Sequence, residues 1–138
     1  MEKHTLPDFI VIDDDRTNNM ICKLIIQNVA PGAVVKTFSN PEEGIAHIKE
    51  NYAHAGANHI VLFLDINMPV LNGWEVLDEF ENSPLPIKPL LTIFMLSSSV
   101  SPDDKLKAAN NPLASGYIEK PLSKARLLEM FPGIVKEQ

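Results

Sequence analysis

Short apolar runs alternate along this chain with longer segments in which apolar residues recur every three or four positions. Residues 9–12, 60–64 and 90–96 are nearly continuous apolar runs that end in charged or polar residues. Such runs are typical of strands that are buried on both faces of a sheet. Residues 33–38 and a short segment centred on residues 117–118 are further strand candidates, so five strands are expected in all.

The segments between these runs show helical spacing. Residues 16–30 form the first predicted helix, and Pro31 with Gly32 ends it. The apolar positions at helical intervals in it are Met20, Ile21, Leu24, Ile25 and Val29. Later helices are indicated by polar residues suited to capping a helix start, followed by apolar residues at helical spacing. These predicted caps are Asn40, Ser101 and Ser123, and a further helix carries Trp74, Leu77 and Phe80.

The order of elements predicts the fold class. Strands that alternate with helices pair in parallel, because a helix is the short way back to the start of the next strand. Right-handed crossovers then place helices on both faces of the sheet. We therefore expect an α/β fold, a doubly wound five-stranded parallel sheet with five helices.

Composition narrows the range of functions. The chain has 138 residues, of which 45% are hydrophobic and 22% charged, which is ordinary for one globular domain. A net charge of −6 argues against direct binding of nucleic acid. The single cysteine, Cys22, excludes an intrachain disulfide and is expected to pack in or near the core. With no apolar run long enough for a signal peptide or a membrane span, the sequence predicts no membrane contact and a cytoplasmic location.

Polar side chains follow four of the five predicted strands. Asp13 and Asp14 follow the first, Asp65 the third, Ser97 the fourth and Lys120 the fifth. Parallel strands bring these positions to one edge of the sheet, where functional groups collect in such folds. Three adjacent carboxylates repel one another, and Mg²⁺ would relieve this because it prefers oxygen ligands. An aspartate there is a possible nucleophile toward phosphorus, with the lysine and the serine as partners for the phosphoryl oxygens.

Asp15 stands apart from the other two aspartates of its run. It directly precedes the first predicted helix, where a carboxylate interacts favourably with the positive end of the helix dipole. We therefore expect Asp15 to begin the helix rather than to bind a metal ion.

Four motifs resemble the receiver domain of two-component response regulators over about residues 8–131. They are VIDDD (11–15), FLDINMPVLNG (63–73), MLSSS (95–99) and GYIEKPL (116–122). The resemblance implies the flavodoxin-like (βα)5 receiver fold. Residues 1–138 would then be a single, stand-alone receiver domain, with residues 132–138 as a C-terminal tail.

The resemblance also implies a role for each site residue. Asp65 would accept a phosphoryl group, Ser97 and Lys120 would bind it, and Ser97 with Tyr117 would form the conformational switch. The implied ligands of Mg²⁺ are Asp13, Asp14, Asp65 and the backbone carbonyl of Asn67. The peptide bond between Lys120 and Pro121 would be cis.

The implied partners are a sensor histidine kinase or a phosphotransfer protein, and an output protein that binds the face formed by the fourth helix, fifth strand and fifth helix. The domain would be no enzyme beyond self-catalysed phosphoryl transfer and slow autodephosphorylation. Three segments depart from the family pattern: the long loop 53–59, residues 110–115, and Pro132 with Gly133, which should end or bend the last helix.

The sequence is also compatible with other classes of protein. A haloacid-dehalogenase-like phosphohydrolase would use Asp13 as nucleophile and Asp15 as acid and base, with Ser97 and Lys120 as accessories. It would need a further acidic pair after the lysine, and residues 121–138 offer only two separated glutamates. A nucleotide- or flavin-binding module would need a loop rich in glycine or hydroxyl groups after the first strand. A receiver that binds partners without phosphorylation would not need the complete set of site residues.

Overall fold

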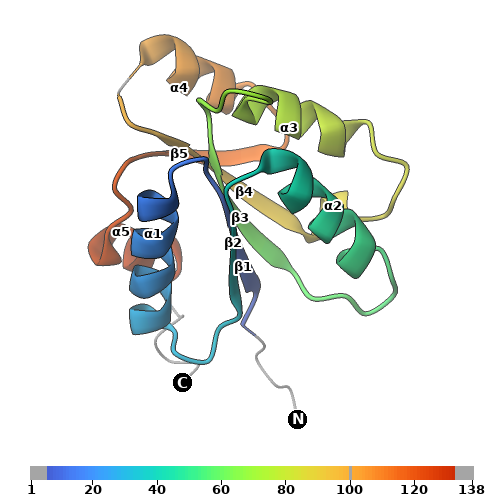
Figure 1. The fold of residues 1–138 in the computed structure, drawn as a ribbon, viewed down its shortest axis with the longest axis horizontal. Coiled ribbons are helices and arrows are strands. Elements are labelled where there is room, and N and C mark those ends of the chain that lie inside the picture. Colours follow the sequence, from blue (N-terminus) through green and yellow to red (C-terminus); the bar gives the residue numbers. More distant parts are fainter. Residues whose placement is uncertain (1–5, 100, 133–138) are drawn as a thin grey trace.

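The computed structural model describes residues 6–99 and 101–132, in which strands and helices alternate (Figure 1). The strands are β1 (Asp8–Ile12), β2 (Val35–Phe38), β3 (Ile60–Asp65), β4 (Leu91–Ser97) and β5 (Ala114–Glu119). The α-helices are α1 (Arg16–Val29), α2 (Pro41–Tyr52), α3 (Gly73–Glu81), α4 (Pro102–Ala109) and α5 (Lys124–Met130). A short 3-10 helix, η1 (Lys88–Leu90), precedes β4.

The strands form one parallel sheet with the order β2-β1-β3-β4-β5. The strand β1 lies inside the sheet, with β2 beside it as one outer strand. The strands β3, β4 and β5 follow in this order on the other side of β1. This confirms the predicted doubly wound, flavodoxin-like fold. All strands therefore end at the same edge, and the direction of winding changes between β1 and β3, where ligands bind in such folds.

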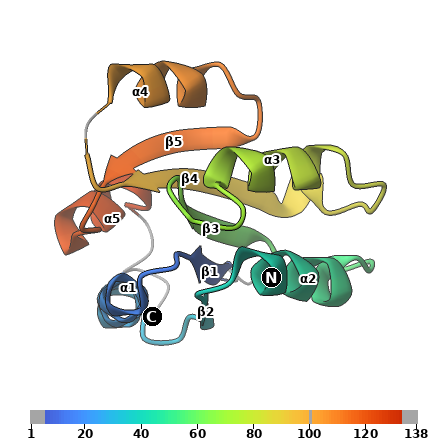
Figure 2. The same cartoon turned by 45° about the horizontal axis from the view of Figure 1, so that its top comes forward.

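Helices cover both faces of the sheet (Figure 2). One face packs against α2, α3 and α4 through residues that include Ile48, Leu77 and Ala108. The other face packs against α1 and α5 through residues that include Ile26 and Leu127. The four apolar residues of β1 from Phe9 to Ile12 are fully buried, because they contribute to both layers in alternation.

The predicted helix caps are confirmed. The Asn40 side chain accepts hydrogen bonds from the backbone N–H groups of Glu42 and Glu43 at the start of α2. Ser101 and Ser123 cap α4 and α5 in the same way. Asp15 caps α1, so its carboxylate satisfies backbone donors of the first turn instead of facing the other acids.

The helix predicted at residues 16–30 is present, but its expected apolar face is partly wrong. Met20 and Leu24 are 63% and 61% exposed, and Ile21 is also exposed. Cys22, Ile26 and Val29 make the buried stripe, and two asparagines extend it toward the sheet edge. Because apolar residues occur nearly all around this helix, their spacing predicts a helix without identifying the face that packs.

Three further features concern the helices. The helix α5 ends at Met130, ahead of Pro132 as expected, while Gly133 and the rest of the expected tail lie outside the described residues. Trp74 at the start of α3 is half-buried, and the Lys107 ammonium of α4 lies 5.2 Å from the centre of its ring. Among the described residues, no helix is long and apolar enough to cross a membrane.

Candidate functional site

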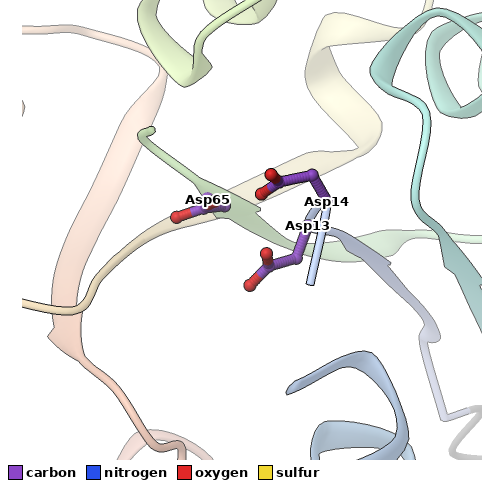
Figure 3. A group of neighbouring side chains, drawn as sticks. All are labelled: Asp13, Asp14 and Asp65. Carbon is purple, nitrogen blue, oxygen red and sulfur yellow. The ribbon is translucent and has the colours of Figure 1, made fainter. Parts of the chain in front are cut away.

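Three aspartates meet at the carboxyl edge of the sheet (Figure 3). Asp13 and Asp14 directly follow β1, and Asp65 is the last residue of β3. Their carboxylates can offer ligand atoms within 4.8 Å of one another. Asp13 and Asp65 are buried whereas Asp14 is exposed, so the cluster opens to solvent on one side. The structure therefore brings together the three acids that the sequence analysis singled out.

The Asp13 carboxylate is held from several directions. Its Oδ1 accepts a hydrogen bond from the backbone N–H of Asp15 at 2.9 Å. Its Oδ2 accepts one from the Asn18 amide at 2.8 Å. The backbone also contributes, because the Asp13 N–H donates to the Phe38 carbonyl at 3.0 Å. The orientation of Asp13 is thus fixed by its own loop, by α1 and by the end of β2.

Sequence reasoning missed the contributions of α1 and β2 to the site. The Asn19 amide donates to the backbone carbonyls of Asp13 at 2.9 Å and Phe38 at 3.4 Å, so it joins the ends of the two strands. A signal was present in the sequence, because Asn18 and Asn19 fall in the first turns of a helix directly after the acidic run. Asparagine is disfavoured inside helices, and a buried asparagine needs partners for its amide.

Lys120 links two of the acids. Its Nζ lies 2.7 Å from Asp13 Oδ2 and 3.1 Å from Asp65 Oδ1. The Lys120 backbone N–H donates to the Ser97 carbonyl at 2.7 Å, which joins the ends of β4 and β5. The following peptide bond to Pro121 is cis, as expected. The backbone at the sheet edge therefore directs the lysine side chain into the acidic cluster.

The electrostatics of the cluster favour a neutralising partner for Asp65. Burial, and then the charge of Asp13, raise the pKa of Asp65 to about 7, although Lys120 opposes this. For Lys120, burial lowers the pKa, but the hydrogen bond and charge of Asp13 followed by those of Asp65 outweigh it, so the pKa is raised. Lys120 therefore stays charged at neutral pH, and its one charge is shared by two carboxylates.

The hydroxyls of Ser97 and Tyr117 share one acceptor. Ser97 ends β4, is fully buried, and donates through Oγ to the Ser99 carbonyl at 2.7 Å. The half-buried Tyr117 on β5 donates to the same carbonyl at 2.9 Å. The Tyr117 hydroxyl also lies 3.5 Å from the backbone N–H of Ser101, the cap of α4. The loop between β4 and α4 is therefore tied to both side chains.

The loop between β3 and α3 passes close to Asp65. A Cβ atom added at Gly73 would lie 2.6 Å from the Asp65 carbonyl oxygen, so this position has room only for glycine. The Gly73 N–H donates to the Ile66 carbonyl at 2.9 Å, which closes the loop. Asn67 lies in this loop and is exposed, and its role as a metal ligand stays a prediction.

The donor set fits a magnesium ion. It consists of carboxylate oxygens from the end of β3 and from the turn after β1, and it is open to solvent at Asp14. Among the residues that the structure describes, the one ammonium group in contact with it is that of Lys120. Mg²⁺ binds through a small number of carboxylates and retains several water molecules. The cluster is therefore a candidate metal site, with Asp13, Asp14 and Asp65 as the residues that could bind the ion.

The geometry disfavours the phosphohydrolase hypothesis. That hypothesis requires the Asp15 carboxylate as a free acid and base, but it accepts hydrogen bonds from the backbone N–H groups of Thr17 at 2.9 Å and Asn18 at 3.2 Å. The acids whose carboxylates lie near that of Asp13 are Asp14 and Asp65, the latter at the end of β3, rather than Asp15.

A doubly wound parallel sheet with three acids, a lysine and a serine at its carboxyl edge defines a receiver-type α/β domain. The chain matches the family described as "Response regulator receiver domain" over residues 9–132. It belongs to this family of two-component signalling proteins. Receiver domains are signalling domains rather than classical enzymes, and they interact with histidine kinases or phosphotransfer proteins.

Known proteins that resemble the chain agree with this assignment. A two component response regulator from Cytophaga hutchinsonii is 28% identical with a TM-score of 0.82, and the match covers 96% of this chain and 99% of that one. A response regulator receiver protein from Dyadobacter fermentans is 26% identical with a TM-score of 0.81, over 91% and 94% of the two chains. The hybrid signal transduction histidine kinase L of Dictyostelium discoideum is 25% identical over 123 residues, which are 88% of this chain but 7% of that protein. The chain thus spans a small part of that curated relative.

Proposed function

We propose that Asp65 accepts a phosphoryl group from a phosphohistidine on a sensor histidine kinase or a phosphotransfer protein. The observation that carries this proposal is the position of Lys120, whose ammonium lies between Asp65 and Asp13 beside a cluster of three acids. A structural ion pair needs one acid. A cluster of three acids, of which one lysine contacts two, leaves negative charge uncompensated, which suits a site that binds a cation and a phosphoryl group.

In the proposed reaction an Asp65 carboxylate oxygen attacks the phosphorus, and the bond from phosphorus to the donor imidazole nitrogen breaks. The imidazole leaves and takes a proton from solvent, while Asp65 becomes an acyl phosphate. Lys120 and the Ser97 hydroxyl would donate hydrogen bonds to the phosphoryl oxygens. Bound Mg²⁺, held by Asp13, Asp14, Asp65 and the Asn67 carbonyl, would supply positive charge to the phosphoryl oxygens.

We further propose that phosphorylation switches a partner-binding surface. If the Ser97 hydroxyl turns to the phosphoryl group, it leaves the Ser99 carbonyl to Tyr117 alone, and the loop before α4 is freed to move. The expected output face is formed by α4, β5 and α5. A groove of about 320 Å³ lies there, with Lys105, Tyr117 and Arg126 among its lining residues. We propose no enzymatic activity beyond this transfer of one phosphoryl group to Asp65. We also propose that residues 1–138 form one receiver domain.

Intact-mass spectrometry tests the phosphoacceptor assignment. The protein is incubated with Mg²⁺ and acetyl phosphate, and we expect a gain of about 80 Da, one phosphoryl group. Asp65→Asn should abolish the gain, whereas Asp78→Asn, which changes an exposed acid on α3, should retain it. A mass gain that persists in Asp65→Asn would refute the assignment. Steady turnover of phosphoesters that is lost in Asp13→Asn would indicate the phosphohydrolase instead.

A further inference from the structure

The buried amide of Asn18 has no role in the function proposed above. Asn18 lies on α1 and is only 6% exposed, on the face that otherwise packs apolar residues against the sheet. A buried amide in a helix costs free energy unless its hydrogen bonds are satisfied. Its Nδ2 donates to Asp13 Oδ2 at 2.8 Å and lies 3.7 Å from Cys22 Sγ. The strong partner of Asn18 is therefore a carboxylate oxygen of the acidic cluster.

Two donors meet at this one oxygen. Asp13 Oδ2 accepts from Asn18 Nδ2 at 2.8 Å and lies 2.7 Å from Lys120 Nζ. The same ammonium is shared with Asp65, at 3.1 Å. When a phosphoryl group is present on Asp65, its oxygens compete for Lys120, and any movement of the ammonium toward them weakens its contact with Asp13. Leaving a buried carboxylate oxygen without a hydrogen-bond donor costs free energy, and the Asp13 carboxylate could then reorient.

We propose that Asn18 is a positioning residue, which holds the Asp13 carboxylate in the orientation that a bound Mg²⁺ needs, both before phosphorylation and while Lys120 moves to the phosphoryl group. This inference rests on the proposed function, because it concerns the same site. A neutral amide suits this role, because it carries no charge that would be drawn to the phosphoryl group or repel a bound cation. Since α1 fixes the Asn18 backbone, the amide stays in place when the lysine moves.

The chain offers a matched control at the other end of the same strand. The Asn58 amide donates to the Asp8 carboxylate at 3.1 Å and to the Leu6 carbonyl at 2.8 Å. Asp8 begins β1, whereas Asp13 follows it, so the two amide–carboxylate pairs lie at opposite ends of this strand. Asn58→Leu therefore removes the same kind of hydrogen bond away from the candidate metal site.

The test measures Mg²⁺ binding to the unphosphorylated protein by isothermal titration calorimetry, so it does not depend on phosphorylation. For Asn18→Leu, which keeps a similar side-chain volume, we expect the dissociation constant to rise about tenfold, as for other residues that orient metal ligands. For Asn58→Leu we expect a value within about twofold of the wild type. Chemical denaturation of both variants gives their stabilities, and only Asn18→Leu should combine lost stability with lost affinity.

Each outcome has a distinct meaning. An unchanged dissociation constant in Asn18→Leu would overturn the inference, and so would an equal loss of affinity in both variants. If Asn18→Leu does not fold, Asn18→Ala takes its place with the same expected tenfold change. If the wild type itself neither binds Mg²⁺ nor gains a phosphoryl group, the proposed function fails. If it does both and the Asn18 variants match it, only the positioning role fails.

Discussion

At the scale of single residues, Asp65 is surrounded by groups with opposing effects on its ionisation. Burial and the neighbouring Asp13 favour the protonated form, and Lys120 favours the charged form. The first two effects prevail, so the pKa of Asp65 is raised from 3.8 to about 7. Without metal, the folded protein therefore holds a proton on Asp65 at pH values where the unfolded chain has lost it.

This arrangement predicts how stability depends on pH. Because the pKa is higher in the folded state, the free energy of unfolding should fall as the pH rises from about 4 to 7, relative to Asp65→Asn, which lacks the titrating group. We expect the difference between the two proteins to change by about 2 to 4 kcal/mol over this range, since one pKa unit corresponds to about 1.4 kcal/mol. Urea denaturation in EDTA at several pH values measures it. A difference that stays constant with pH would show that Asp65 has an ordinary pKa.

The sequence predicted most of the candidate site because strand ends can be located from apolar runs. Asp13 and Asp65 each follow such a run, Lys120 follows the short fifth strand candidate, and a parallel sheet must bring these positions to one edge. Asn18 and Asn19 could not be placed in the same way. Their importance depends on which face of α1 turns inward, and that is decided by packing in three dimensions.

At the scale of elements, α1 shows the limit of hydrophobic spacing. Its buried stripe runs through Cys22, Ile26 and Val29, while Met20 and Leu24 remain exposed. Both sets fit a helical period, because in residues 20–26 only Lys23 interrupts the apolar character. On the side that packs, the amides of the two asparagines also reach hydrogen-bond partners at the ends of β1 and β2.

Two substitutions on α1 test this orientation. Ile26→Ala removes a side chain with no exposed surface and should lower the free energy of unfolding by about 2 to 5 kcal/mol. Leu24→Ala changes a side chain that is 61% exposed and should alter it by no more than about 0.5 kcal/mol. Chemical denaturation of both variants measures the contrast. A larger loss for Leu24→Ala than for Ile26→Ala would mean that α1 packs through the face that the sequence spacing favoured.

At the scale of the whole molecule, the acidic cluster exists only because the sheet is assembled. Asp13 and Asp65 lie 52 positions apart in the chain and meet because β1 and β3 pair in parallel. The sequence predicted a doubly wound sheet from the order of its elements. It did not predict the strand order, because apolar runs do not record which strands become neighbours.

A ligand of the assembled cluster should therefore stabilise the entire fold. At a Mg²⁺ concentration of about 100 times the dissociation constant, binding to the folded state alone adds about 2.7 kcal/mol. For a domain of this size we expect the melting temperature to rise by about 5 to 10 °C relative to EDTA. Asp14→Asn should lose most of this rise, and Asp103→Asn, an exposed acid on α4, should keep it. An equal rise in both variants would indicate non-specific binding of the cation.

The contact between Trp74 and Lys107 has a practical consequence. Trp74 is the single tryptophan of the chain, and the ammonium above its ring belongs to α4, the helix that follows the loop held by Ser97 and Tyr117. Indole fluorescence responds to a nearby charge and to solvent, so any displacement of α4 from α3 changes the emission of this one residue. The protein thus carries an intrinsic optical reporter on α3 that contacts α4 of the expected output face, and no label is needed to follow the motion in real time.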